Sequence, residues 1–274
     1  MLKTRIITAS LLVTGLLITL FFVNHAVWSW LTLLVILLAA TEWASLIRLT
    51  RPQALSLAIA VFLIGVFVQW MPHAALADYQ SVVALVFLGL ATVFWLLIAP
   101  FWLISRRTCE HALFMAALGV VLLIAAWLGV VGLRAENIWL LIGAIATVSL
   151  ADSAAYFSGK RFGRHKLAPE ISPGKTWEGV FGAVLAVTIY AVLLCVYLAI
   201  SFWLIPLLWM VVVLSVIGDL VESLLKRQAG LKDSGHLLPG HGGILDRIDG
   251  FIPTLPLILL CANLEILSRL HING

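Results

Sequence analysis

The chain has 274 residues, of which 63% are hydrophobic and 11% charged, and its formal net charge is +4. Soluble domains carry roughly 25% charged residues, and a chain of this size could not hide so much apolar surface from water. The composition therefore excludes a soluble globular protein and predicts an all-α, polytopic membrane protein. In such a protein the small positive charge reflects the side of the membrane on which each loop lies, and it does not indicate nucleic-acid binding.

Apolar runs long enough to cross a bilayer, about 20 residues each, predict about nine transmembrane helices. The first run follows two basic residues, as a signal peptide does, but no small-residue cleavage site follows it, so we predict an uncleaved helix. The stretch from Trp177 to Ile217 would make a helix about twice the bilayer thickness, and we divide it near Ser201 and Pro206. The predicted spans are residues 6–23, 27–47, 54–72, 82–104, 111–133, 138–158, 177–200, 202–225 and 251–268.

Lysine and arginine predict the orientation of these spans. With a cytoplasmic N-terminus, fifteen of the seventeen Lys and Arg residues fall in cytoplasmic segments, and the two that fall outside are Arg134 and Arg269. Such an asymmetry is typical of the cytoplasmic side of a membrane protein. The sequence therefore predicts an inner-membrane protein whose N-terminus is cytoplasmic and whose C-terminus lies outside.

The chain divides into two regions of different character. Residues 1–135 have short loops and few polar groups within the spans, and we interpret them as a variable region for anchoring and packing. Residues 136–274 carry two long cytoplasmic loops, roughly 159–176 and 226–250, and most of the intramembrane acids. Because charge within a membrane is rare and usually functional, we predict that the second region is catalytic.

Acidic residues in the second region predict a metal site near the cytoplasmic face. Asp152 and Asp219 each lie about six residues before the cytoplasmic end of a span, so both should lie roughly 9 Å inside it. Hard oxygen ligands from several helices at one level suit Mg²⁺, and the number of acids leaves room for a second cation. Alternatively, each acid pairs with a nearby Lys or Arg and only holds the bundle together. The candidate ligands are Asp152, Asp219, Glu222, Asp246 and Asp249. Glu42, which has no companion motif, is expected to form a structural hydrogen bond or ion pair.

Two loop motifs predict contacts with phosphate. Ser172, Lys175 and Thr176 fall at the start of a predicted helix, where free N–H groups and the helix dipole favour an anion. A nucleotide P-loop is excluded there, because Pro169 occupies the position of its first glycine and no strand is predicted before it. In the other loop, His241 precedes Gly242 and Gly243, and paired glycines can direct backbone N–H groups at oxyanions.

The segment from Ser223 to Asp249 resembles the signature of the phosphatidate cytidylyltransferases, also called CDP-diacylglycerol synthases. That signature combines S-x-aliphatic-K-R, K-D, H-G-G and D-R-x-D within 27 residues, and SPGKTWEG at residues 172–179 also resembles a family motif. The resemblance covers roughly residues 140–260. The matching residues are Ser223, Lys226, Arg227, Lys232, Asp233, Gly235, Pro239, His241, Gly242, Gly243, Asp246, Arg247 and Asp249.

The resemblance implies an enzyme that converts CTP and phosphatidic acid into CDP-diacylglycerol and pyrophosphate with Mg²⁺. Asp219 and Asp246 would bind the metal, with Asp152 as a third ligand or a partner of the ligands. Asp233 would orient Lys232 or contact the nucleotide. The cationic residues implied to neutralise the phosphates of CTP and of the lipid are Lys226, Arg227, Lys232 and Arg247.

Two other functions stay open at this point. A CTP-dependent polyprenol or phytol kinase has related architecture, but the complete signature favours the cytidylyltransferase. An ion-coupled transporter would place its acids near the bilayer midplane and could show inverted repeats. The oligomeric state is also open, because Gly179 and Ala183 form a small-residue face that suits either packing within the chain or a homodimer.

Overall fold

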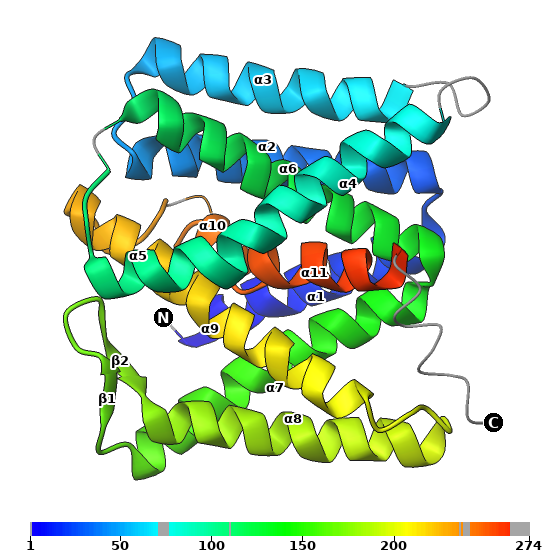
Figure 1. Ribbon diagram of the computed structural model, residues 1–274, viewed down its shortest axis with the longest axis vertical. Coiled ribbons are helices and arrows are strands. Elements are labelled where there is room, and N and C mark those ends of the chain that lie inside the picture. The colour runs from blue at the N-terminus through cyan, green and yellow to red at the C-terminus, as the bar shows by residue number, and fades with distance from the viewer. Residues whose placement is uncertain (1, 71–76, 110, 236, 238–241, 264–274) are drawn as a thin grey trace.

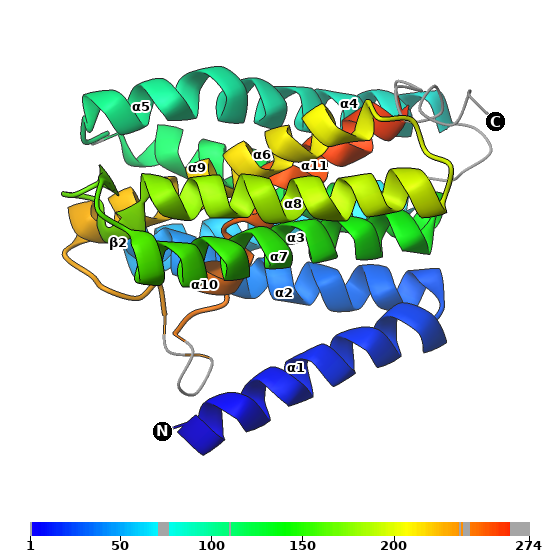
Figure 2. The same ribbon diagram turned by 90° about the horizontal axis from the view of Figure 1, so that it is seen from below.

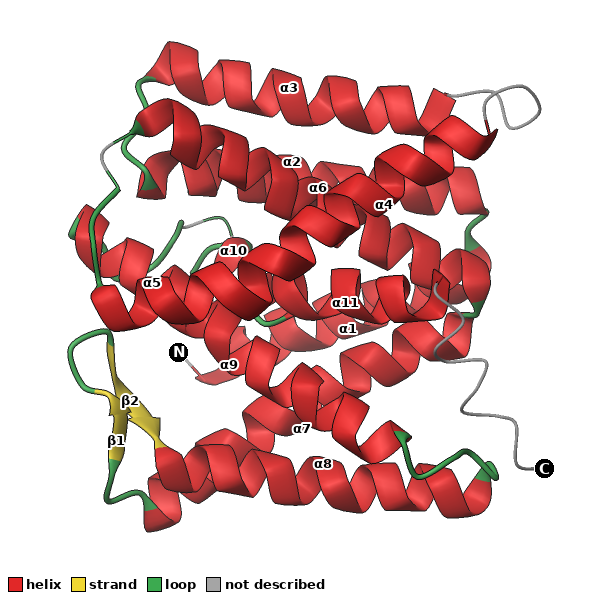
Figure 3. Cartoon of the chain, viewed as in Figure 1, coloured by secondary structure: helices red, strands yellow, loops and turns green. Residues whose placement is uncertain are grey.

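The protein is described by a computed structural model that covers residues 2–70, 77–109, 111–235, 237 and 242–263 (Figure 1). Within these residues, seven helices are long and apolar enough to cross a membrane, and two shorter apolar helical segments lie at Val13–Phe22 and Phe251–Asn263. The prediction of an all-α, multi-pass membrane protein is confirmed at this level. Figure 3 shows how helices dominate, with one small sheet at the edge.

The helices follow the predicted spans closely. The first region forms α1 (Leu2–Phe22), α2 (His25–Leu46), α3 (Arg51–Trp70), a continuous rod of α4 (Ala77–Val93), π-helical η1 (Phe94–Ile98) and α5 (Ala99–Ser105), and then α6 (Ala112–Glu136). The second region forms α7 (Ile138–Phe162), strands β1 (Lys166–Ala168) and β2 (Ser172–Thr176), α8 (Trp177–Tyr197), α9 (Leu204–Ala229), α10 (Leu245–Ile248) and α11 (Phe251–Asn263).

Successive long helices run in opposite directions through the bundle. The last residues of α2, α5, α7 and α9 therefore lie at the same end as the two strands, on the left in Figures 1 and 2. We call this the hairpin end. The predicted division of the long apolar stretch is confirmed, because α8 ends at Tyr197 and α9 begins at Leu204. Both loops that were predicted to be cytoplasmic start from the hairpin end.

Glycines allow close packing of helices both between the two regions and within the second region. A Cβ added to Gly129 on α6 would lie 2.8 Å from the backbone of Leu255 on α11, so only glycine permits this approach. On α8, a Cβ on Gly179 would lie 2.9 Å from the carbonyl oxygen of Ala155 on α7, and Ala183 is only 1% exposed. The small-residue face of α8 therefore serves packing within the chain, and it offers no free surface for a dimer.

The loop before α8 differs from the sequence prediction. We expected no strand there, yet β1 and β2 form an antiparallel hairpin in which Lys166 pairs with Thr176 and Ala168 with Ser172. Ile171 at its tip is buried against Leu220 and Leu224 of α9. This contact fixes the hairpin on the bundle, and no periodicity could have revealed it, because the strands have only three and five residues.

The loop after α9 also differs, because it folds back into the bundle. A Cβ on Gly250 would lie 2.6 Å from Ser215 Oγ and 3.2 Å from Val148. Ser215 precedes the end of α9 by fourteen residues, about 21 Å along the helix. Asp249 therefore lies deep within the bundle, although residues 226–250 were predicted to form a cytoplasmic loop. Irregular backbone is tolerated at such depth only where protein covers it.

Candidate active site

Lys226 joins two of the predicted acids in a shielded cluster. Its Nζ donates hydrogen bonds of 2.6 Å to Glu222 Oε2 and to Asp246 Oδ1. The side chains of Lys226, Glu222 and Asp246 are 12%, 6% and 7% exposed, respectively. Glu222 and Lys226 meet because residues four apart lie on one face of a helix. Charges so well shielded from water interact much more strongly than exposed ones, so this cluster holds α10 against α9.

The second oxygen of Asp246 is bound by the loop that precedes it. Asp246 Oδ2 accepts hydrogen bonds from the backbone N–H groups of Ser234 at 3.0 Å and Gly243 at 2.8 Å. Burial alone would raise the pKa of Asp246, but hydrogen bonds from Lys226 and Gly243 lower that pKa to about 2. Gly242 has a φ of 80°, a conformation that glycine adopts readily. Asp246 is thus a fully ionised carboxylate at neutral pH.

A second acid–lysine cluster lies beside the first one. Lys175 on β2 places its Nζ 2.6 Å from Asp219 Oδ2 on α9, and Ser223 Oγ donates to Asp219 Oδ1 at 3.2 Å. From α7, Asp152 accepts a hydrogen bond of 3.4 Å from Ser215 Oγ, one turn before Asp219. Asp152 and Asp219 each stand ten residues before the end of their helix, so the predicted equal depth is confirmed, although it is greater than expected.

Asp249 adds a third carboxylate to this second cluster. A Cβ on Gly218, the residue before Asp219, would collide with the backbone carbonyl oxygen of Asp249. Asp249 Oδ1 accepts a hydrogen bond of 2.8 Å from the Gly250 N–H, and Gly250 packs against Ser215, the residue that donates to Asp152. The three acids, with Lys175 bound to Asp219, therefore form one neighbourhood that draws on α7, α9, β2 and the segment between α10 and α11.

The donor atoms and the charge of this region suit a divalent cation. All five predicted ligands are carboxylates, which hard cations such as Mg²⁺ prefer. In the described region, their ion-pair partners are the two ammonium groups of Lys175 and Lys226, so the carboxyl groups outnumber the ammonium groups. One oxygen of Glu222, Oε1, is buried without a hydrogen-bond partner. No group of three or more His, Cys, Asp or Glu among the described residues is arranged to hold a metal ion, so the ligand set stays a prediction.

The hairpin places Lys175 beside the acids, whereas the neighbouring predicted phosphate ligands make other contacts. Thr176 caps α8, accepting a hydrogen bond of 3.1 Å from the Gly179 N–H, and its side chain is buried. Ser172 is half-buried at the opposite end of β2. Arg227 on α9 donates from Nε to the carbonyl oxygen of Ile171 at 3.3 Å and so supports the hairpin tip. The three residues predicted to bind one phosphate therefore do not face a single point.

Other predicted substrate-binding residues are exposed on the surface. Arg227, Lys232, Asp233 and Arg247 are all exposed. Cationic groups in this position are accessible to an anionic substrate that arrives from water. His241 lies outside the described residues, whereas Gly242 and Gly243 lie next to Asp246 as described above.

Glu42 on α2 also reaches the site, from the region predicted only to anchor the protein. Glu42 is 4% exposed, and its carboxylate accepts three hydrogen bonds from the signature loop, which we define as residues 230–250. The predicted structural hydrogen bond is therefore confirmed. Its connection to the site was not predicted, because a single glutamate in an apolar span has no sequence signal that names its partner.

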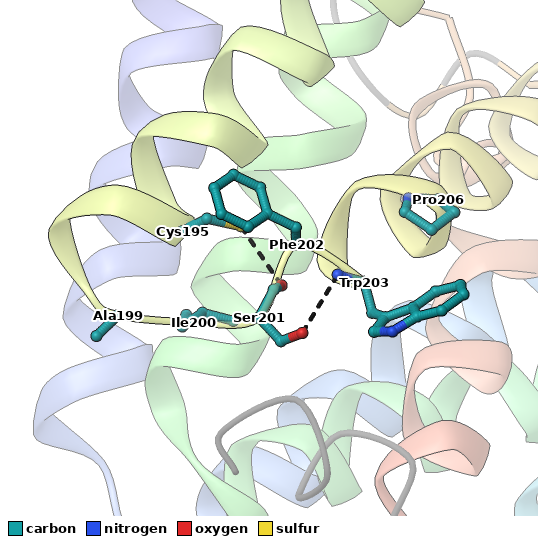
Figure 4. Close-up of a pocket in the computed structure, with 7 residues that line it drawn as sticks. All are labelled: Cys195, Ala199, Ile200, Ser201, Phe202, Trp203 and Pro206. Carbon is teal, nitrogen blue, oxygen red and sulfur yellow. Dashed lines mark hydrogen bonds between the residues drawn. The ribbon is translucent and has the colours of Figure 1, made fainter. Parts of the chain in front are cut away.

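A hollow elsewhere on the molecule is not part of this site. Figure 4 shows it at the connection between α8 and α9, where Phe202 and Trp203 are exposed beside Ser201 and Pro206. This connection lies at the opposite end of the bundle from the hairpin (Figure 1). Exposed aromatic residues at a helix end are typical of the membrane–water interface, and the pocket contains no acid or base.

Comparison with known proteins identifies the family of the chain. Residues 3–264 match the Cytidylyltransferase family. The chain is 39% identical to the phosphatidate cytidylyltransferase of Pseudomonas aeruginosa over 276 residues, covering 93% of this chain and 95% of that protein. It is 33% identical to the phosphatidate cytidylyltransferase of Haemophilus influenzae over 285 residues, covering 93% and 96%. A third relative of the same name, from Staphylococcus epidermidis, is 46% identical over 130 residues, covering 46% and 49%. The chain therefore belongs to the cytidylyltransferase family.

Proposed function

We propose that this protein is a phosphatidate cytidylyltransferase, which converts CTP and phosphatidic acid into CDP-diacylglycerol and pyrophosphate during phospholipid biosynthesis. The observation that carries the proposal is the pair of acid–lysine clusters, bordered by exposed basic residues, inside a membrane bundle of the cytidylyltransferase family. Relatives named for this activity match the chain over nearly its whole length.

The chemistry requires charge stabilisation more than it requires a base. The attacking oxygen belongs to the phosphate of phosphatidic acid, which is already ionised at neutral pH. As the bond to pyrophosphate breaks, negative charge grows on the leaving group, and cationic groups stabilise that charge. The exposed residues Arg227, Lys232 and Arg247 would bind the phosphates, and Asp233 would orient Lys232.

Residues of the hairpin and of the glycine turn would complete the phosphate contacts. Lys175 would leave or share Asp219 to contact a phosphate, with Ser172 and Thr176 shaping the hairpin around it. Gly242 and Gly243, together with His241, would present donors to the other substrate. Lys226 is already bound by two buried acids, so we assign it the task of holding Asp246 in place.

Magnesium would be held by Asp219 and Asp246, with Asp152, Glu222 and Asp249 as further ligands or as partners of the ligands. When bound, Mg²⁺ supplies Lewis-acid stabilisation of the phosphate charge. The surplus of carboxyl groups over the ammonium groups of Lys175 and Lys226 supports this assignment, and it leaves room for a second cation.

The active site would face the cytoplasm from the inner membrane. The ratio of fifteen Lys and Arg residues to two supports a cytoplasmic hairpin end, nine spans, a cytoplasmic N-terminus and an external C-terminus. In this arrangement CTP reaches the exposed basic residues from water, whereas phosphatidic acid reaches the same level laterally from the bilayer.

Product analysis tests the proposal. Purified protein is incubated with labelled CTP, Mg²⁺ and vesicles containing phosphatidic acid, and the products are separated. We expect CDP-diacylglycerol and pyrophosphate in equal amounts, and less than a tenth of either product with Asp219→Asn protein. Release of CDP with a phosphorylated lipid alcohol, when polyprenol or phytol replaces phosphatidic acid, would identify a lipid kinase and overturn the proposal.

A further inference from the structure

Glu42 binds the signature loop through both of its oxygens. Oε1 accepts a hydrogen bond from the Ile244 N–H at 3.0 Å, while Oε2 accepts from the Leu245 N–H at 2.7 Å and from Ser234 Oγ at 3.0 Å. The carboxylate is almost completely buried. A buried carboxylate needs such donors, because burial removes its hydrogen bonds to water and protein donors must replace them. Three donors from the loop therefore meet one acceptor from α2.

The loop is shaped around this carboxylate. A Cβ on Gly235 would collide with Glu42 Oε1, and a Cβ on Gly243 would collide with Glu42 Oε2 and with Ser234 Oγ. Neither glycine has a φ in the left-handed region, so closeness to Glu42 explains these two glycines better than backbone conformation does. Glu42, a residue of the first region, therefore fits closely against a loop about 200 residues later in the chain.

Glu42 and Asp246 are bound by the same short stretches of the loop. The Ser234 backbone N–H and the Gly243 N–H donate to Asp246 Oδ2, and the Asp246 N–H donates to Ser234 Oγ at 3.3 Å. Leu245, whose N–H binds Glu42, directly precedes Asp246. Moving the Glu42 carboxylate would therefore move the donors and the backbone that place Asp246.

We propose that Glu42 is a positioning residue for nucleotidyl transfer: through Ser234 and the backbone of residues 243–245 it sets the place of the Asp246 carboxylate. Helix α2 is then a structural part of the active site. The inference rests on the proposed function for its kinetic consequence, but the contact itself does not depend on that function. Glu42 touches no substrate, and its effect passes through Asp246.

A matched pair of variants separates positioning from general stability. Glu42→Gln keeps the size of the side chain but replaces one acceptor oxygen with an NH₂ group, which faces an N–H or O–H donor. Ser29→Ala is the control, because Ser29 is equally buried on α2 and loses one hydrogen bond, a 2.7 Å bond to Gln69 Oε1. Ser29 lies thirteen residues before Glu42, about 20 Å along the helix.

We expect Glu42→Gln to lower kcat at least tenfold and to raise the Mg²⁺ concentration for half-maximal activity several-fold, with a smaller change in KM for CTP. Ser29→Ala should keep kcat within twofold. Ser234→Ala should be impaired, and the double variant with Glu42→Gln should lose less than the product of the two single losses, because both act through one contact. A merely structural role for Glu42 would lower activity in proportion to the folded fraction and leave the Mg²⁺ requirement unchanged, and this result would overturn the proposal.

Hydrogen exchange gives a readout that is independent of activity. The amides of residues 243–246 should exchange faster in Glu42→Gln than in wild-type protein and should be unchanged in Ser29→Ala. Unchanged exchange of these amides in Glu42→Gln would overturn the inference whatever the reaction. A wild-type protein that makes no CDP-diacylglycerol would overturn the proposed function instead, and faster exchange in Glu42→Gln would still support the contact.

Discussion

Replacing Lys226 with methionine should destabilise the protein strongly. Lys226 is 12% exposed and separates two carboxylates that are 6% and 7% exposed, each 2.6 Å from its Nζ. The variant leaves Glu222 and Asp246 buried together without a cation. Removing one partner of a buried ion pair costs about 3–5 kcal/mol. For a chain of this size, such a loss lowers the melting temperature by roughly 10 °C.

Lys175 provides the matched comparison because its ion pair is more accessible. Its side chain is 23% exposed, and its partner Asp219 is 38% exposed. Pairs in contact with solvent contribute about 1 kcal/mol or less, so Lys175→Met should lower the melting temperature by only a few degrees while it still impairs activity. The double variant Lys226→Met/Glu222→Gln should melt higher than Lys226→Met, because one of the two uncompensated charges has gone.

Intrinsic tryptophan fluorescence of the purified protein in detergent at pH 7 measures all of these melting temperatures. The reasoning is refuted if Lys226→Met melts at the same temperature as Lys175→Met, or if adding Glu222→Gln lowers the melting temperature of Lys226→Met further. Either result would mean that water reaches the cluster and screens its charges.

Other predictions concern the hairpin, acid stability and topology. Ile171→Ala should raise KM for CTP more than it lowers kcat. The reason is that Ile171 packs against Leu220 and Leu224 and so fixes the hairpin that holds Lys175. An unchanged KM for CTP would contradict this. The pKa of Asp246 is lowered from 3.8 to about 2, so its stabilisation is complete above about pH 4 and is lost as pH falls towards 2. Between about pH 4 and pH 2 the wild-type protein should therefore lose about 2 kcal/mol of unfolding free energy that Asp246→Asn does not lose. The same dependence of the unfolding free energy on pH in both proteins would disprove the assignment. A reporter fused after Gly274 should lie on the opposite side of the membrane from one inserted within residues 159–176, and reporters on the same side would exclude nine spans.

Hydropathy predicted the helices well because membrane spans leave a strong signal. The division between α8 and α9 was found from Ser201 and Pro206, although the apolar stretch is almost continuous. Asp152 and Asp219 were predicted at matching depth from their distance to the span ends, and the hydrogen bond from Ser215 to Asp152 supports this. Spacing along straight helices is enough for inferences of this kind.

The path of the signature loop could not be predicted from the sequence. The charged residues of this loop predict that it lies in water, yet Asp246 and Asp249 lie within the bundle. Burial is possible there because Lys226 and Glu42 supply a cation and an acceptor from distant positions. Such compensation depends on tertiary contacts, which a single sequence does not contain. The same reason explains why Glu42 could be assigned a hydrogen bond but no partner, and why Lys226 was expected to bind phosphate and not to hold Asp246.

The rate of the Asp219→Asn variant tests the central claim most directly, namely that the carboxylates between α7, α9 and the signature loop carry catalysis. Steady-state kcat/KM for CTP is measured with phosphatidic acid and saturating Mg²⁺, and the melting temperature is measured on the same preparation. We predict less than a tenth of the wild-type value, a barrier increase above about 1.4 kcal/mol, with a melting temperature close to that of the wild type. A variant that folds normally and keeps more than a tenth of wild-type kcat/KM would contradict the claim.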